Sequence, residues 1–168
     1  MLSPNVCVAV DLVLSEMKRP RMLTILMWFC ALYAIGALIG IVAVVLDLGR
    51  FIGGYTIGGM AVNRGTWLRI AAPLIAMVAV LMAATAFALK HHRPRARITF
   101  MLIWPLIVLY GVGCAIINAV PWTLGLRAVV DATFVGASAA WLLFRYKPSR
   151  FYFAELKKFS YSDNRWGG

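Results

Sequence analysis

Four long apolar stretches run along the chain, separated by short segments that hold most of the charged residues. These stretches cover residues 22–46, 67–89, 98–120 and 122–144. The hydrocarbon core of a bilayer is about 30 Å thick and needs roughly 20 apolar residues as a helix. The pattern therefore predicts an all-α integral membrane protein, a four-helix bundle of two antiparallel helix hairpins within a single membrane domain.

Prolines interrupt or join the expected helices. Pro73 and Pro105 lie inside the second and third helices. Kinks of this kind are tolerated in membranes because neighbouring helices can satisfy the carbonyls that proline leaves free. Val120 and Pro121 join the third and fourth helices, and proline begins a new helix at low cost. The two internal prolines are therefore compatible with membrane spans, and a tight turn is predicted between the last two helices.

The basic residues divide unequally between the two sides of the membrane. One side holds Lys18, Arg19, Arg21, Lys90, Arg93, Arg95, Arg97, Arg145, Lys147, Arg150, Lys157, Lys158 and Arg165, which is 13 residues. The other side holds four, namely Arg50, Arg64, Arg69 and Arg127. Because loops rich in Lys and Arg stay in the cytoplasm, both termini are expected there.

The composition changes how this charge is interpreted. Hydrophobic residues make up 62% of the chain, and 17 Lys and Arg against 6 Asp and Glu give a net charge of +11. In a soluble protein such a charge would suggest nucleic acid. Here the charges flank apolar blocks, which indicates anionic lipid headgroups and no nucleic-acid partner. The expected headgroup contacts are Arg93, Arg95, Arg97, Lys147, Arg150, Lys157 and Lys158.

Two flanking segments, residues 1–21 and 145–168, have the pattern of interfacial helices. The C-terminal segment carries an apolar stripe beside two lysines: Phe151, Tyr152, Leu156 and Phe159 beside Lys157 and Lys158. Such a stripe predicts a helix lying flat on the anionic leaflet, followed by a tail. In the N-terminal segment, Ser3 and Pro4 form a helix-start signal. The alternative for both segments is frayed chain.

Arg127 and Asp131 are the charges that lie well inside an apolar stretch. They are four residues apart and therefore share one helix face. Asp131 would lie roughly 13 Å below Trp122, close to the midplane of the membrane. A lone charge at this depth costs at least a few kcal/mol, so the pair is expected to face other helices or a wet cavity. Two interpretations stay open: a structural ion pair that fixes packing, and a proton or substrate site.

Small residues recur at spacings that let helices approach closely. Gly36 and Gly40 form such a pair in the first helix. Ala132, Gly136 and Ala140 do the same in the fourth helix. Both faces are predicted to pack against a helix, either of this chain or of another.

The segment 47–66 is the longest connection and contains six glycines, including two Gly-Gly steps in a five-residue echo. Glycine together with apolar residues suits a backbone that lies against a surface. The predicted docking residues are Gly53, Gly54, Tyr55, Gly58 and Gly59, and the surface is the bundle, the headgroups or a partner. The alternative is a flexible connector.

The two halves of the chain also resemble each other. Arg19-Pro20-Arg21 precedes the first helix and Arg93-Pro94-Arg95 precedes the third. Leu32–Ala37 resembles Leu109–Cys114. A duplicated two-helix unit, a 2+2 repeat, would explain these matches. The alternative is that all membrane helices share Leu, Gly and flanking Arg.

Enzyme chemistry lacks candidate residues. His91 and His92 are the two histidines of the chain, and they are adjacent in a short basic loop. This arrangement disfavours a haem held by two helices and a histidine-based metal site. We expect no catalytic residue, no metal and no cofactor.

In length and expected topology the chain resembles immunity proteins against pore-forming bacterial toxins, which are small four-helix proteins of the bacterial inner membrane. It also resembles accessory subunits of respiratory, secretion and photosynthetic complexes. The resemblance covers topology and no specific residue. It implies a non-catalytic protein of the bacterial inner membrane that binds a partner in or at the bilayer. The alternative is a small homo-oligomeric transporter or channel that uses Arg127 and Asp131.

Overall fold

The computed structural model describes residues 20–48 and 54–164, and side chains of the last helix up to Leu156. Residues 1–19 of the predicted N-terminal interfacial segment, and Gly53 of the predicted docking loop, lie outside the described residues. The described chain is mostly helical. It contains four spans that are long and apolar enough to cross a membrane, namely Arg21–Val45, Arg64–Lys90, Ala96–Ile116 and Trp122–Arg145.

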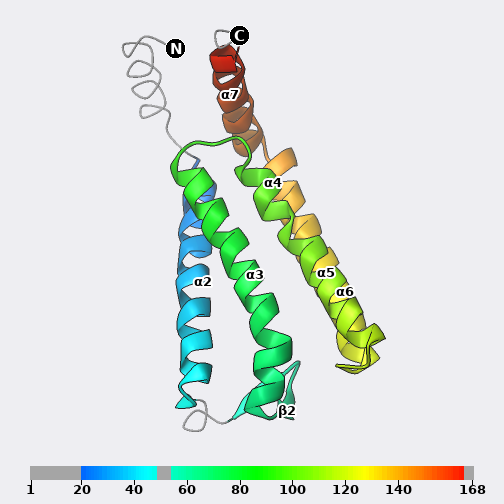
Figure 1. Ribbon diagram of the computed structural model, residues 1–168. Helices are drawn as coiled ribbons and strands as arrows, with labels where there is room; N and C mark the ends of the chain where they lie inside the picture. Colours follow the sequence, from blue (N-terminus) through cyan, green and yellow to red (C-terminus); the bar gives the residue numbers. More distant parts are fainter. Residues whose placement is uncertain (1–19, 49–53, 165–168) are drawn as a thin grey trace.

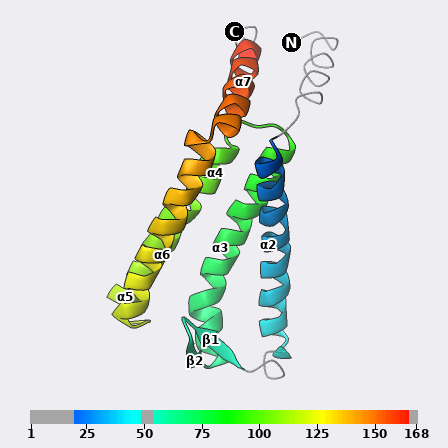
Figure 2. The same cartoon turned by 180° about the vertical axis from the view of Figure 1, so that it is seen from behind.

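Figures 1 and 2 show how the spans are arranged. Helix α2 (Arg21–Val45) lies beside α3 (Arg64–Lys90), and α5 (Ile103–Ile116) lies beside α6 (Trp122–Ala140). The two helix pairs are close together near the α3–α4 turn and spread apart toward the opposite end. We call the first the basic end, because Lys90, Arg93 and Arg95 lie there, and the second the β-hairpin end.

The third span is broken near its start. Helix α4 (Ala96–Met101) and α5 are separated at Leu102. Pro105 has no N–H to donate to the carbonyl four residues before it, that of Met101, so the helical ladder is weakened at this point. The span ends at Ile116, earlier than the predicted residue 120.

Asn118 explains this early end. It adopts a left-handed backbone with φ of 55°, which asparagine tolerates better than most residues. The Ala119 N–H then bonds to the Cys114 carbonyl at 2.9 Å, and the Asn118 N–H bonds to the Ala115 carbonyl at 3.1 Å. These two bonds close the helix as a Schellman motif, so α5 cannot continue to Pro121.

The fourth span changes its winding before it ends. After α6 the chain forms a π-helical turn, η2 (Trp141–Arg145), in which the Tyr146 N–H bonds to the Trp141 carbonyl at 3.0 Å. Pro148 follows shortly and cannot donate to the Phe144 carbonyl, so the regular ladder could not run through this point. Helix α7 (Lys147–Asn164) begins after the extended residue Tyr146.

The Gly-rich connection contains a small sheet, which the expectation of an all-α fold did not include. Strands β1 (Tyr55–Ile57) and β2 (Met60–Val62) pair antiparallel, with Ile57 opposite Met60. Gly58 and Gly59 form the turn, with φ of 58° and 86°. A two-residue turn with positive φ at both positions is the tight turn that glycine favours in hairpins.

The buried core lies toward the basic end of the molecule. It brings together residues from both helix pairs and from α7, including Leu23, Leu89, Phe100, Ile103, Leu143 and Phe153. Toward the β-hairpin end the helix pairs diverge, as Figure 1 shows. The fold therefore holds the two pairs together at one end and lets them diverge at the other.

Candidate functional site: a groove between the helix pairs

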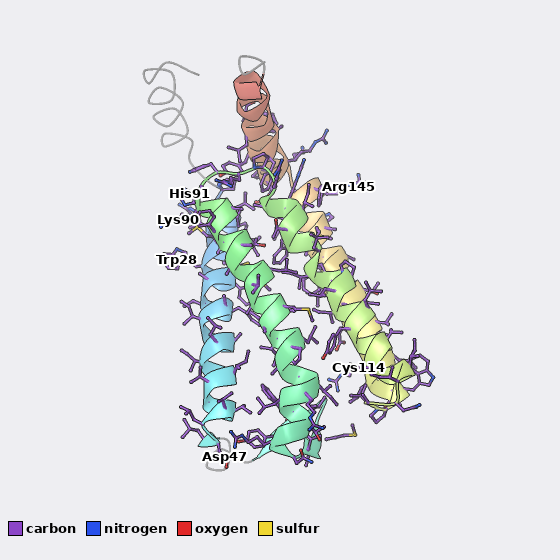
Figure 3. The ribbon with its side chains drawn as sticks, viewed as in Figure 1. Trp28, Asp47, Lys90, His91, Cys114 and Arg145 are labelled. Atoms are coloured by element: carbon purple, nitrogen blue, oxygen red, sulfur yellow. The ribbon has the colours of Figure 1, made fainter. Side chains whose placement is uncertain are left out.

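A groove of about 300 Å³ lies between the two helix pairs, toward the β-hairpin end. Helix α3 forms one wall and helices α5 and α6 form the other, while the turn of the β-hairpin closes one side. Most of the lining is apolar, and the charged residues that line it are Arg127 and Asp131. Cys114, labelled in Figure 3, lines the groove from α5.

Arg127 and Asp131 form an ion pair within this groove. The Arg127 Nε lies 3.6 Å from the Asp131 Oδ2. The side chains are 69% and 66% exposed, so the four spans of this chain do not enclose them. Other helices or a wet cavity were the expected surroundings of the pair, and in the described residues the pair lines an open groove between the two helix pairs.

A hydrogen bond crosses the floor of the groove. The Tyr110 hydroxyl on α5 donates to the Ile70 carbonyl on α3 at 2.8 Å. The accepting carbonyl lies next to a break in the hydrogen bonding of α3. Pro73 has no N–H, so the carbonyl of Arg69, one residue before Ile70, lacks its usual donor. The bond links α3 to α5 at residues that line the groove.

The β-hairpin touches the second helix pair at its turn. A Cβ added to Gly58 would collide with the Leu124 side chain of α6. Glycine at this position therefore serves two needs, the positive φ of the turn and the close approach to α6. Gly54 and Gly59 have no neighbour where a Cβ would lie. Of the surfaces expected for this loop, the described residues show docking on the bundle itself.

Further contacts fasten the loop to the end of α2. The Tyr55 hydroxyl donates to the Asp47 carboxylate at 2.7 Å. The Arg64 guanidinium donates from Nε to the Val44 carbonyl at 3.0 Å, and from Nη2 to the Val45 carbonyl. A cation at the C-terminus of a helix is favourable because free carbonyls gather there. The β-hairpin therefore forms one side of the groove and is held to the end of α2.

The small residues of α6 pack against α5. Ala132 is buried, and a Cβ on Gly136 would lie 3.0 Å from the Trp104 ring. The buried face continues at Ala139, whereas the predicted Ala140 is half-buried. The sequence pattern did not single out Gly125 of this face, which lies against Ala115.

Gly36 and Gly40 on α2 behave differently. A Cβ added to either glycine would meet no atom within 4 Å. Neither glycine therefore brings two helices of this chain together in the described residues. The surface that these two glycines contact is therefore lipid or a helix of another chain.

The basic residues expected at the headgroups divide into two groups. Arg93, Arg95, Lys147 and Arg150 are exposed at the basic end. Arg97 is half-buried, and its guanidinium carbon lies 5.1 Å from the Phe144 ring centre and 5.5 Å from that of Phe153. Arg97 therefore serves packing through cation–π contacts. The side chains of Lys157 and Lys158 lie outside the described residues.

Helix α7 departs from the expected flat orientation. Figures 1 and 2 show it extending beyond the basic end in roughly the direction of the spans, rather than across them. Tyr152 and Leu156, two residues of the predicted lipid-facing stripe, are buried in the protein core together with Phe153. The Tyr152 hydroxyl also bonds to His92 Nδ1 at 2.9 Å. Only Phe151 of the described stripe is exposed, because the protein itself covers the rest.

The described residues contain no group of three His, Cys, Asp or Glu side chains that could hold a metal ion. Comparison with protein-family models, with curated proteins and with solved structures finds no match to the chain. The functional interpretation therefore rests on the groove and its ion pair.

Proposed function

We propose that this chain is a non-catalytic integral membrane protein that binds a partner within the bilayer at the groove between its helix pairs. In this proposal the spans form two antiparallel hairpins in the bacterial inner membrane, with the basic end in the cytoplasm. The partner is a subunit of a membrane complex, for which this chain is an accessory subunit, or a toxin that it blocks.

The ion pair carries the proposal. Arg127 and Asp131 lie five and nine residues after the start of α6, so Asp131 lies roughly 13 Å along the helix, near the middle of a bilayer. About two thirds of each side chain is exposed in the isolated chain. Charged groups in contact with lipid at this depth are costly, and they almost always face a bundle interior or a wet cavity. A partner that covers the groove would remove this cost.

Photo-crosslinking in native membranes tests this proposal. A photoreactive residue at Ile75, which lines the groove, should form an adduct with a second protein. The same residue at Val80, 68% exposed on α3 and absent from the groove lining, is the matched control and should label only lipid. Replacing both charges, Arg127→Gln with Asp131→Asn, should abolish the adduct at position 75. Labelling of lipid alone at both positions would refute the proposal.

The size of the groove favours a second candidate function, that of a small homo-oligomeric transporter or channel. A volume of about 300 Å³ lies at the small end of the range for ligand pockets. If the adduct at position 75 proves to be a second copy of this chain, a homo-oligomeric transporter or channel with a polar path at Asp131 becomes the better interpretation. An adduct with a protein of different sequence supports the accessory subunit or blocker.

The orientation makes a separate prediction. In a variant with Cys7, Cys30 and Cys114 replaced by alanine, a cysteine at Thr56 should react with a membrane-impermeant maleimide from outside intact cells. A cysteine at Arg95 should react only after the cells are opened. Both positions are exposed in the structure, so accessibility reports the side of the membrane and not burial. Labelling of position 95 in intact cells would reverse the topology.

A further inference from the structure

A second pocket adjoins the groove, with a volume of about 740 Å³. It shares Ile70, Tyr110 and Cys114 with the groove, but none of its lining residues comes from α6. Thr66 and Arg69 line it from α3, and its other walls are mainly apolar residues of α5. We call it the Arg69 pocket.

The polar rim of the Arg69 pocket is positive. Thr66 and Arg69 are three residues apart and so lie on one face of α3. Among the described residues, no group bonds to the Arg69 guanidinium or to the Thr66 hydroxyl. The first turn of α3 contains no acidic residue, and free N–H groups add a partial positive charge at the start of a helix. This rim favours an anion.

The position of the rim along the helix places that anion at the membrane surface. Arg69 is the sixth residue of α3, which puts its Cα roughly 8 Å from the helix start. Arginine side chains on a helix point toward its N-terminus, here the β-hairpin end, and extend so that the charge reaches the headgroups. The Arg69 guanidinium can therefore lie at headgroup level while its stem stays among apolar groups.

The rest of the pocket suits a long apolar chain. Its second wall begins at Ala119, just past the end of α5, and continues along α5 to Leu109, about two helical turns below the end of that helix. Leu109 and Ile117 are each 73% exposed and present apolar surface to the membrane. Gly113 lies between them, and a Cβ there would meet no atom within 4 Å, so space remains beside the helix.

We propose that the Arg69 pocket binds one anionic phospholipid from the leaflet at the β-hairpin end. The phosphate accepts hydrogen bonds from the Arg69 guanidinium and the Thr66 hydroxyl, and one acyl chain lies along α5 over Gly113. Guanidinium groups match phosphate because they donate two parallel hydrogen bonds. This inference does not depend on a partner in the groove.

Native mass spectrometry of the purified full-length protein in detergent, titrated with phosphatidylglycerol, tests the site. The wild type should retain one phosphatidylglycerol per chain at concentrations where phosphatidylcholine is lost. Arg69→Gln should raise the dissociation constant about tenfold, the range of a hydrogen bond to a charged group. Gly113→Leu leaves Arg69 in place and fills the open space, and it should also displace the lipid.

Arg145→Gln is the matched control, because it removes one exposed positive charge at the basic end, at a residue outside the expected headgroup contacts. It should bind phosphatidylglycerol as the wild type does. Equal losses in Arg69→Gln and Arg145→Gln would show attraction by net charge alone and would overturn the proposal. Displacement of the lipid by inorganic phosphate at equal concentration would assign the site to a free anion instead. Unchanged binding in Gly113→Leu would remove the acyl-chain position and refute the proposed pocket.

Discussion

Asp131→Asn is expected to destabilise the folded protein in a bilayer more than the double change Arg127→Gln with Asp131→Asn. The single change leaves the Arg127 charge without the carboxylate that lies 3.6 Å away. An uncompensated charge at membrane depth costs about 2.5–3.5 kcal/mol on insertion scales. The double change removes both charges and should cost less than about 1 kcal/mol, because no charge is left behind. Equilibrium unfolding in phospholipid bicelles, followed by helix content, measures the difference.

Ser138→Ala is the control for this comparison. Ser138 lies seven residues after Asp131 on α6 and is also exposed, but its hydroxyl bonds to the Phe134 carbonyl of its own helix at 3.0 Å. Its removal should change the free energy of unfolding by no more than about 0.5 kcal/mol. The free energies of unfolding lost in Arg127→Gln and in Asp131→Asn could also simply sum to the loss in the double variant. That result would show that the two charges are not coupled, and it would contradict the view that they are paired in the groove.

The spans were predictable because one physical quantity controls them. The bilayer core requires a minimum apolar length, and each of the four stretches meets it, so the pattern and the structure agree on four spans. The ends of the helices depend on single residues instead. Asn118 in its left-handed conformation ends α5 before residue 120. Asparagine is a stop signal for helices, but the apolar length that set the predicted bounds does not register a single residue of this kind.

The groove was not predictable, although its charged residues were. A spacing of four residues brings Arg127 and Asp131 together on any helix. Their exposure depends on the spread of the helix pairs, which follows from contacts between distant residues such as Tyr110 and Ile70. No local pattern encodes such contacts.

The internal repeat stays a prediction. Tyr33 and Tyr110 occupy matching places in the two similar segments, yet their surroundings differ. Tyr33 lies beside the Phe29 ring of its own helix and is 38% exposed, whereas Tyr110 bonds to the Ile70 carbonyl of α3. If the halves share an origin, these positions have since taken separate roles.

Phe153→Ala is expected to have the largest effect of any single change in α7. The side chain is 1% exposed, its ring lies 5.3 Å from that of Tyr152, and the Arg97 guanidinium lies over it. Truncating a buried phenylalanine typically costs about 3–5 kcal/mol, because a cavity remains. The contact with Arg97 is lost as well. Limited trypsin digestion should therefore cleave after Lys157 and Lys158 much faster, since α7 detaches from the core.

Phe151→Ala distinguishes the two possible positions of α7, docked on the protein core or flat on the leaflet. Phe151 lies two residues away on the same helix and is 73% exposed. If α7 docks on the protein through Tyr152, Phe153 and Leu156, Phe151→Ala should leave both trypsin cleavage and the unfolding temperature nearly unchanged. If α7 instead lay flat on the leaflet, Phe151 would be one of its lipid anchors, and its removal should weaken membrane protection at least as much as Phe153→Ala does. Faster cleavage of Phe151→Ala than of Phe153→Ala would thus restore the interfacial orientation that the sequence pattern predicts.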